Sequence, residues 1–212
     1  MSISSKSLFH FTPKFEYLRG IIKSGFKFRL CREELPLLGN GSRIIGRPNI
    51  VLHIHSPFVI CFCDLPLSAS KIHRDQYGKY AIAMTKEWGM MNKITPIRYV
   101  HSHTPGFTKE AARSALDLQY VRAYEGDWMD RATGQSTHRT FYDEREWRAA
   151  SPTDDGWIDF KFGDIRHIIV TTNDERKAIG NQLIDASEDL EIGDETRVWG
   201  KIHIASEIFG DI

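Results

Sequence analysis

Apolar residues in this chain gather in short runs of strand length, separated by segments with helical spacing. The pattern predicts strands over 8–12, 26–30, 57–66, 79–85, 94–100, 165–172 and 198–205. The run 57–66, PFVICFCDLP, is almost continuous in apolar residues, which is typical of a strand buried on both faces of a sheet. Helices are expected over 13–24, 108–124 and 173–187, with a further short helix ending at Gly78.

The helical spacing is clearest directly after the first predicted strand. Phe15, Leu18 and Ile22 recur on one face of a helix, and Gly25 follows as a stop signal. Asn173 is expected to cap the last helix, since a short polar side chain can bind the free backbone N–H groups of the first turn. Both helices therefore present one apolar face to a core.

The segments between these elements complete the expected architecture. Residues 32–57 are rich in Gly, Asn and Pro and are expected to be irregular, and the polar segment 127–139 is expected to be a loop. Strands and helices do not alternate strictly, which favours an α+β fold over a doubly wound parallel sheet. At 212 residues, the chain is expected to form a single domain over 1–212.

The stretch 141–149, FYDEREWRA, is densely charged between aromatic residues. If it is a strand, Glu144, Glu146 and Arg148 share one face, because successive strand residues point to opposite sides. Two acids on one face repel each other unless Arg148 or a ligand offsets their charge. The stretch is therefore either an edge strand held by cross-strand ion pairs or a strand whose acids perform chemistry.

The first strand, LFHFT, raises a similar question. His10 and Thr12 fall on one face, and Phe9 and Phe11 fall on the other. An imidazole within an apolar strand needs a hydrogen-bond partner. His10 is thus either a satisfied core histidine or a residue that lines a pocket.

Composition narrows the classes of protein and ligand. Lys and Arg together number 28, as do Asp and Glu, so the net charge of zero argues against bulk electrostatic capture of nucleic acid or of an acidic membrane. No apolar run approaches the ~20 residues that span a bilayer, and the N-terminus has no signal-like apolar core. Three cysteines, an odd number, favour a reducing compartment, so we expect a cytoplasmic protein.

Neither a metal site nor a nucleophile-type active site is favoured by the sequence. The pairs that share a strand face are Cys61/Cys63, His53/His55 and His101/His103, and none has a further ligand at suitable spacing beside it. The chain contains no G-x-S-x-G, P-loop or G-x-G-x-x-G motif. We therefore expect packed cysteines, surface histidines and no metal.

Several stretches together resemble one family. LFHFT, LRGIIKSGF, FVICFCDLPLSASKIHRDQYGKYAIAMTKEWG, ITPIRYV and DEREWR are similar to the AbiGi family of bacterial abortive-infection proteins. The order of His, Tyr and Glu on successive strands is more distantly similar to ADP-ribosyltransferases, including DarT-like toxins. This second resemblance implies an ADP-ribosyltransferase-like fold, with a split, mixed or antiparallel sheet flanked by helices.

The resemblance to ADP-ribosyltransferases also implies residue roles around NAD as co-substrate. A first-strand histidine holds the ribose in such enzymes, which points to His10 with Thr12 beside it. An aromatic residue stacks on the nicotinamide, and either Tyr77 or Tyr80 in YGKY matches that position.

Acidic residues supply the catalysis in that family. Glu146 corresponds to the catalytic glutamate, which stabilises the oxocarbenium-like transition state through the ribose hydroxyl, and Glu144 is the upstream acid. Arg148 or Arg145 would neutralise these acids or meet the NAD pyrophosphate. The middle motif reads CFCDLPLS in place of S-T-S, so an arginine acceptor is not implied.

These resemblances predict a phage-defence effector that transfers ADP-ribose from NAD to a macromolecule, with RNA or DNA favoured over protein. Arg131 and Arg139 in the 127–139 loop, and Arg113 and Arg122 in the preceding helix, would hold a phosphate backbone. Two alternatives remain open. One is a non-catalytic antitoxin-type protein that binds a cognate toxin, and the other is an NAD glycohydrolase.

Overall fold

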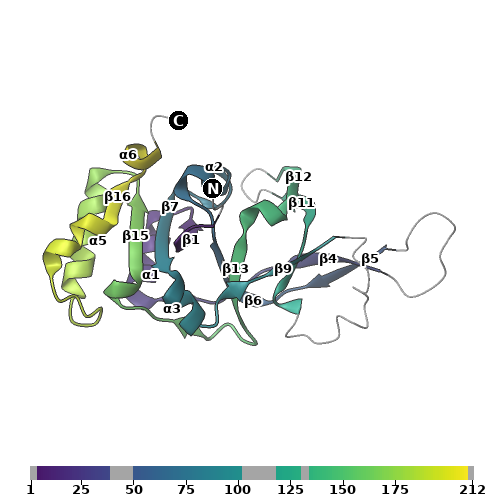
Figure 1. Ribbon diagram of the computed structural model, residues 1–212, viewed down its shortest axis with the longest axis horizontal. Coiled ribbons are helices and arrows are strands. Elements are labelled where there is room, and N and C mark those ends of the chain that lie inside the picture. Colours follow the sequence, from purple (N-terminus) through teal and green to yellow (C-terminus); the bar gives the residue numbers. More distant parts are fainter. Residues whose placement is uncertain (1–3, 39–49, 102–117, 130–133, 210–212) are drawn as a thin grey trace.

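The computed structural model describes residues 4–38, 50–101, 118–129 and 134–209. Its centre is an eight-stranded sheet (Figure 1) in the order β16-β15-β7-β1-β6-β13-β8, with β3 also paired to β6. These strands are β1 (Ser7–Thr12), β3 (Arg29–Leu30), β6 (Phe58–Cys63), β7 (Tyr80–Thr85), β8 (Thr95–Pro96), β13 (Glu146–Ser151), β15 (Ile165–Val170) and β16 (Ile202–Ile204). Every pairing in this sheet is antiparallel except β15 with β16, which confirms the expected α+β class and mixed sheet.

The sheet opens between two of its central strands. β1 pairs with β7 along its whole length, and β6 pairs with β13 along its whole length. β1 and β6, by contrast, are in register only at Phe9 and Cys63. The two halves of the sheet are therefore joined at a single residue pair, which lies at the C-terminal end of β6.

The two faces of the sheet are covered unequally. The larger core packs under α1 (Phe15–Ser24), α3 (Lys86–Met91) and α5 (Asn173–Asp185), which supply Leu18, Trp88 and Leu183 among others. The smaller core contains Phe9, Phe11 and Ala83 and packs under α2 (Lys71–Tyr77) and α6 (Ala205–Phe209). Apolar residues that alternate along β1 thus enter two separate cores.

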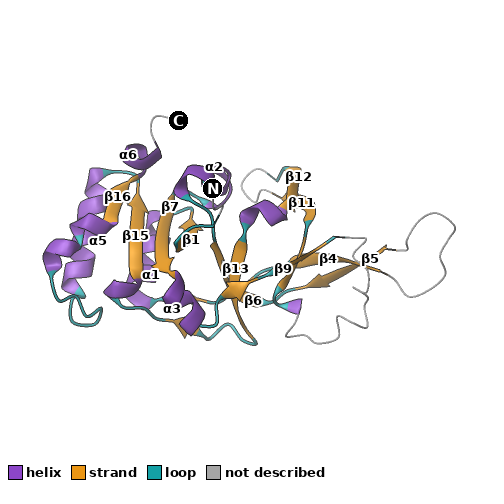
Figure 2. Cartoon of the chain, viewed as in Figure 1, coloured by secondary structure: helices purple, strands orange, loops and turns teal. Residues whose placement is uncertain are grey.

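Two segments expected to be irregular contain paired strands (Figure 2). Within 32–57, β4 (Glu33–Leu38) pairs with β5 (Ile50–His55) to form a ribbon that extends from the body (Figure 1). Within 127–139, β11 (Glu125–Met129) pairs with β12 (Ser136–Thr140). The loop predictions were wrong there because turn-forming residues mark only the tip of a hairpin, not the whole segment.

The helix expected over 108–124 is wrong at its C-terminal end. Residues 102–117 lie outside the described ranges, but Val121–Ala123 form strand β10, which pairs in parallel with β9 (Arg98–Val100). Apolar residues at Leu118 and Val121 fit a helical period as well as a short buried strand, so spacing alone could not separate the two.

Smaller differences concern where elements begin and break. The strand expected over 26–30 is divided into β2 (Phe26–Lys27) and β3, and β2 pairs with β14 (Trp157–Ile158). The 94–100 strand is likewise divided into β8 and β9. Thr172, not Asn173, caps α5, in a capping box with Glu175. In the described part of the chain, no helix is long and apolar enough to cross a membrane.

Candidate functional site

The seven predicted site residues separate onto the two faces of the sheet. One face carries Tyr77, Glu144, Glu146 and Arg148, and the other carries His10, Thr12 and Tyr80. Cys63 on β6 is directly opposite both Phe9 on β1 and Glu146 on β13, so these three residues share a face. His10 follows Phe9 in β1 and therefore points to the opposite face.

Glu146 and Arg148 form the centre of a buried ion-pair network. Nε of Arg148 donates to Oε1 of Glu146 at 2.7 Å, and Nη2 donates to Oε1 of Glu33 at 2.7 Å. Nη1 of Arg148 donates to the Gln119 carbonyl at 3.0 Å, and the side chain is fully buried. The backbone N–H of Glu146 donates to the Tyr99 hydroxyl at 2.8 Å. Arg148 therefore pairs with Glu146 and with Glu33 on β4.

Arg122 on β10 is a second buried guanidinium in the network. Its Nη1 donates to Oε2 of Glu146 at 2.8 Å and also to Oε2 of Glu144. Its guanidinium lies 4.3 Å from the centre of the Phe141 ring. The sequence predicted that Arg122 lies on a helix and holds a phosphate backbone, but the structure places it on a strand, with its charge directed at the two acids.

Glu144 reaches this network by a route that strand alternation does not describe. Residues Phe141–Glu144 form a 3-10 helix, and Arg145 adopts a left-handed conformation with φ 48° before β13 begins at Glu146. The prediction of one continuous strand through 141–149 was therefore wrong. Glu144 and Glu146 nevertheless converge, because the turn at Arg145 redirects the chain and both carboxylates bind Arg122.

Two residues of helix α2, which packs on the same face of the sheet, lie beside the network. The Tyr77 hydroxyl donates to Oε1 of Glu144 at 2.8 Å. One turn earlier, the His73 ring lies 5.2 Å from the Tyr77 ring and 6.0 Å from the Phe11 ring. Sequence reasoning did not single out His73, although its spacing of four from Tyr77 places both residues on one helix face.

The electrostatics of the two glutamates differ. Burial opposes ionisation of Glu146, but Arg148 and Arg122 outweigh it and hold the pKa at about 2. Burial raises the pKa of Glu144, and Arg122 offsets this only in part while the charge of Glu146 adds to it. Burial, together with the nearby charge of Arg122, lowers the pKa of His73 to about 4. At neutral pH Glu146 is therefore a carboxylate and His73 a neutral imidazole.

On the opposite face, His10 is held within the larger core. Its Nδ1 lies 2.8 Å from the Cys61 carbonyl oxygen, and its ring packs edge-on against Phe26 and tilted against Phe62. Burial lowers the pKa of His10, and the bond to the carbonyl counteracts this in part. The histidine thus has the partner that a core imidazole needs.

Tyr80 also serves the larger core and the start of α5. It lies opposite Thr12 in the β1–β7 ladder, and its hydroxyl donates to Oε1 of Glu175 at 2.7 Å. Glu175 in turn accepts from the backbone N–H and hydroxyl of Thr171. Of the two tyrosines left open by the sequence, Tyr77 therefore lies beside the acids and Tyr80 does not.

The cysteines lie on or near the face of the network. Burial and the charge of Glu33 raise the pKa of Cys31 to about 12, and burial also raises the pKa values of Cys61 and Cys63. Thiols in such surroundings are poor nucleophiles. Among the described residues, no group of three or more His, Cys, Asp or Glu side chains is arranged to hold a metal ion. His103 lies outside these residues.

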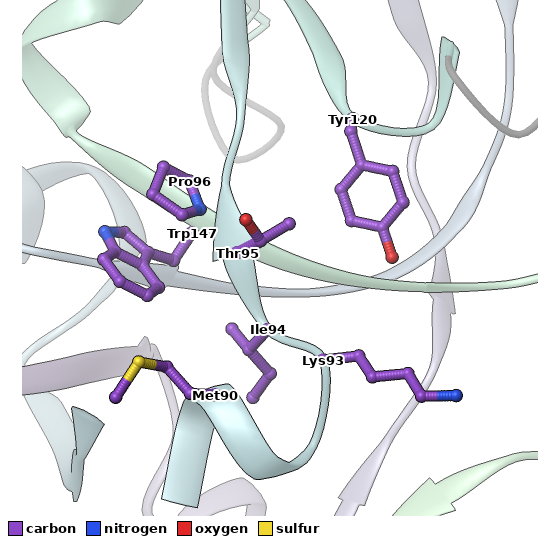
Figure 3. A pocket seen from close by; sticks show the side chains of 7 residues that line it. All are labelled: Met90, Lys93, Ile94, Thr95, Pro96, Tyr120 and Trp147. Atoms are coloured by element: carbon purple, nitrogen blue, oxygen red, sulfur yellow. The ribbon is translucent and has the colours of Figure 1, made fainter. Parts of the chain in front are cut away.

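A separate open depression of about 500 Å³ lies at the β8 edge (Figure 3). Its lining residues are Met90, Lys93, Ile94, Thr95, Pro96, Tyr120 and Trp147. Trp147 lies between Glu146 and Arg148 in β13, so it points to the face opposite the network. The depression and the ion-pair network therefore lie on different sides of the sheet.

The NAD arrangement implied by the resemblance needs a histidine and a glutamate in one cleft. His10 and Glu146 lie on opposite faces of the sheet, and each already has hydrogen-bond partners within the protein. The described residues therefore do not form a cleft in which both could hold one NAD molecule. The roles of these residues in NAD binding and catalysis stay predictions.

Fold and network define an α+β protein whose central sheet carries a buried cluster of three glutamates and two arginines on one face. Comparison with known protein families then identifies the family to which the chain belongs. Residues 26–176, well over half of the chain, match the family described as "Putative abortive phage resistance protein AbiGi, antitoxin". The chain belongs to this family, which confirms the resemblance read from its motifs.

The chain is also similar to a curated protein, "Abortive phage resistance protein AbiGi" of Lactococcus lactis subsp. cremoris. The two are 35% identical over 63 residues, which is 27% of this chain. The match spans only 24% of the length of that relative. No solved structure matches the chain.

Proposed function

We propose that this chain is the antitoxin-type component of a phage abortive-infection system and acts by binding a protein partner. The description of its family names an antitoxin, and the Lactococcus relative is named a phage resistance protein. Both descriptions suit a role in phage defence. A binding protein needs a stable surface and no reactive group, and the chemistry of the buried network is consistent with that requirement.

The observation that carries this proposal is that both carboxylate oxygens of Glu146 already accept hydrogen bonds from arginines of the same chain. Oε1 accepts from Arg148 and Oε2 accepts from Arg122, each within 2.8 Å. Its side chain is 4% exposed, and its pKa of about 2 makes the carboxylate a weak base. Removing one partner of such a buried pair leaves an uncompensated charge, so the network supports a structural role for Glu146.

Growth assays distinguish an antitoxin from a toxin. We expect expression of this chain alone in a host without its partner to leave the growth rate unchanged. In the native strain, we expect deletion of its coding sequence to arrest growth, because a partner is no longer neutralised, and a plasmid copy to restore growth. A matched plasmid that carries a frameshift early in the coding sequence is the control.

The opposite pattern would contradict the proposal. Growth arrest on expression alone, together with a harmless deletion in the native strain, would show that the chain is itself the toxic component. A deletion that is harmless in a strain where expression is also harmless would show that the chain neutralises nothing under those conditions, which is equally incompatible with an antitoxin.

An NAD-dependent ADP-ribosyltransferase is the second candidate, because the pKa of Glu144 is raised, whereas that of Glu146 is lowered. The pKa of Glu144 is raised by burial, and Tyr77 donates to its carboxylate beside the neutral His73. Acids with raised pKa values beside a tyrosine occur at catalytic sites. The acceptor would be a macromolecule, RNA or DNA before protein, as in DarT-like enzymes.

Labelled NAD tests this candidate. Incubation with purified chain and cell extract should transfer label to RNA, DNA or protein if the chain is a transferase, and Glu144→Gln should reduce labelling at least 100-fold. Release of free ADP-ribose without labelled polymer would instead indicate an NAD glycohydrolase. Unchanged NAD in the presence of folded protein would eliminate both enzymes.

A further inference from the structure

The depression at the β8 edge of the sheet combines an apolar part with a polar part. Figure 3 shows Trp147, Pro96 and Met90 on one side of β8. Lys93 and Tyr120 lie on its other side. The volume of about 500 Å³ is within the roughly 300–1,000 Å³ of pockets that enclose small ligands. Tryptophan, tyrosine and methionine are enriched at protein interfaces, so the lining has the composition of a binding surface.

The apolar part joins a fixed aromatic ring to an adaptable side chain. Trp147 is held by the pairing of β13 with both β6 and β8. Lys86, which pairs with Asp64 at 2.8 Å, lies 5.3 Å from the centre of the Trp147 ring. Met90 is 60% exposed near the end of α3, and a flexible thioether fits irregular surfaces and contacts aromatic rings favourably. A large apolar side chain from outside can therefore pack between the two.

The polar part contains a lysine in an unfavourable backbone conformation. Lys93 follows α3 and has φ 58°. Its backbone N–H donates to the Met90 carbonyl, and the N–H of Ile94 donates to the Gly89 carbonyl. This is the Schellman arrangement, in which glycine is usual at the left-handed position because a side chain there costs free energy. Strained residues gather at sites that clamp ligands, which points to a use for the Lys93 side chain.

The charge of Lys93 is available to another molecule. Among the lining residues, Lys93 alone is charged, and its side chain is exposed. In the described part of the chain, the lysines that pair with carboxylates are Lys86 and Lys161. The Tyr120 hydroxyl lies on the same side of β8 as Lys93 (Figure 3) and can donate a hydrogen bond. An ammonium and a hydroxyl together suit a carboxylate.

We propose that this depression is the surface by which the chain holds its protein partner, and that the occupant is a partner segment with an acidic residue next to a large apolar one. The apolar side chain packs on Trp147 and Met90. The carboxylate pairs with Lys93 and accepts a hydrogen bond from Tyr120. The inference rests on the proposed partner-binding function and names the surface and the chemistry that would carry it.

Other kinds of segment match the depression less well. A basic residue in the same position would be repelled by Lys93, and like charges brought together across an interface disfavour the wrong partner. A purely apolar segment would cover the ammonium without supplying a charge of opposite sign, which is costly. The combination of an acid with a large apolar side chain satisfies both parts of the depression.

Three capped dipeptides test this combination. Acetyl-Phe-Glu-amide carries both groups, acetyl-Phe-Gln-amide lacks the charge, and acetyl-Ala-Glu-amide lacks the large apolar side chain. Each is titrated into the purified chain at constant ionic strength, and the NMR shifts of the Lys93, Ile94 and Thr95 amides and of the Trp147 indole N–H are followed. We expect saturable shifts with acetyl-Phe-Glu-amide and severalfold weaker binding of the other two.

Two neighbouring methionines assign the apolar contact. Met90→Gln should weaken the binding of acetyl-Phe-Glu-amide severalfold. Met91→Gln is the matched control, because Met91 is 74% exposed on the same helix but does not line the depression. Its affinity should equal that of the unaltered chain.

Lys93→Gly separates binding from stability. The variant should bind acetyl-Phe-Glu-amide no better than acetyl-Phe-Gln-amide, because the ammonium is absent. Its melting temperature should not fall, because glycine adopts a φ of 58° without strain. A lysine with a merely structural role would show the reverse, with lower stability and unchanged binding.

A growth assay carries the test to the partner itself. In the strain from which the coding sequence is deleted, a plasmid copy with Met90→Gln and Lys93→Glu together should fail to restore growth. The matched copy carries Met91→Gln and Lys177→Glu, since Lys177 is exposed on α5 and does not line the depression. That copy should restore growth fully.

Several results would overturn the inference. These are equal affinities for the three dipeptides, unchanged affinity in folded Met90→Gln or Lys93→Gly, and equal restoration of growth by the two plasmid copies. Shifts of the same amides when the chain is concentrated without peptide would show that a second copy is the occupant. If the deletion leaves growth unaffected, the antitoxin proposal fails, whereas the dipeptides still decide whether the depression recognises this pair of side chains.

Discussion

At the scale of single residues, the meaning of Glu146 depends on which groups surround its carboxylate. A glutamate on a strand beside a second acid resembles a catalytic residue when only the sequence is considered. In the fold, Arg148 from the same strand and Arg122 from β10 occupy its two oxygens. The same residue type in the same motif can thus hold a structure together, because the neighbours decide whether the carboxylate is available.

We expect Glu146→Gln to lower the free energy of unfolding by about 3–5 kcal/mol at pH 7, since it leaves two buried guanidiniums without their shared partner. Urea unfolding followed by circular dichroism measures this change. Glu34→Gln at the exposed pair with Arg32 should change stability by less than ~1 kcal/mol. A loss at Glu146 no larger than that at Glu34 would contradict the structural role of the network.

The pKa of Glu146 also predicts a dependence of stability on pH. Because the folded value of about 2 lies below the ordinary 4.5, the unfolded chain binds more protons between these values. The contribution of Glu146 is therefore present above pH 4.5 and is lost as the pH falls toward 2. It amounts to roughly 3 kcal/mol, at about 1.4 kcal/mol for each unit of pKa.

Unfolding midpoints measured from pH 7 to pH 2 check this dependence. The unaltered chain should lose stability more steeply below pH 4.5 than Glu146→Gln, in which the titrating group is absent. Parallel curves for the two proteins would show that Glu146 does not have a depressed pKa in the folded state.

At the scale of elements, the junction of α2 and β7 places Tyr77 and Tyr80 on opposite faces of the central sheet. Tyr77 ends α2 beside Glu144, and Tyr80 begins β7 in the larger core. Gly78 between them has φ 120°, a conformation that side chains disfavour, and a Cβ there would collide with Pro13 and the Thr12 carbonyl. Glycine at this position lets the helix end directly against β1.

Gly78→Ala should therefore destabilise the protein by roughly 2–5 kcal/mol, through backbone strain and the collision with β1. Thermal unfolding measures the loss. Gly20→Ala in the interior of α1 is the matched control, because nothing lies within 4 Å of its added Cβ and alanine favours the helix by up to about 1 kcal/mol. Equal effects at the two glycines would exclude a close approach at Gly78.

At the scale of the whole molecule, the central sheet and the β4–β5 ribbon differ in how deeply their strands are enclosed. Ala81–Met84 of β7 are fully buried between the two cores, and β15 and β1 pair with β7 on either side. β4 and β5, by contrast, form a two-stranded ribbon that extends from the body (Figure 1), and in the described part of the chain only the base of β4 is known to be anchored there, through the buried Glu33 and Leu35. Two-stranded ribbons are marginally stable by themselves.

We expect hydrogen exchange to follow this division. Amides of β7 and β15 should exchange only when the whole protein unfolds, whereas ladder amides of the ribbon beyond its base, at Leu37, Leu38, Ile50 and Val51, should exchange at least 100-fold faster. Exchange measured by NMR at several urea concentrations separates local from global opening. Equal protection of these outer ladder amides and of β7 would show that the outer part of the ribbon is also held by contacts beyond its own ladder.

Local patterns in the sequence were enough for the elements that bury apolar residues with a clear period. The apolar run at 58–63, the helical face of Leu18 and Ile22 and the alternation of β1 all appear in the fold as expected. The same patterns failed at 121–123, where a three-residue strand pairs with Arg98–Val100. They also failed in the two ribbons, where turn-forming and polar residues led to an expectation of loops although consecutive strands pair as hairpins. Short strands are stabilised by the partner strand, and that partner is invisible to a local period.

For the candidate site, motifs and local alternation were enough to indicate the family, the charged stretch 143–148 and the opposite directions of Phe9 and His10. The tertiary fold, in contrast, places His10 and Glu146 on opposite faces, because this depends on how β1, β6 and β13 are paired. It also brought in Arg122, Glu33 and His73 from remote segments. Electrostatic fields act through space, so the state of a carboxylate is set by neighbours that the order of residues does not reveal.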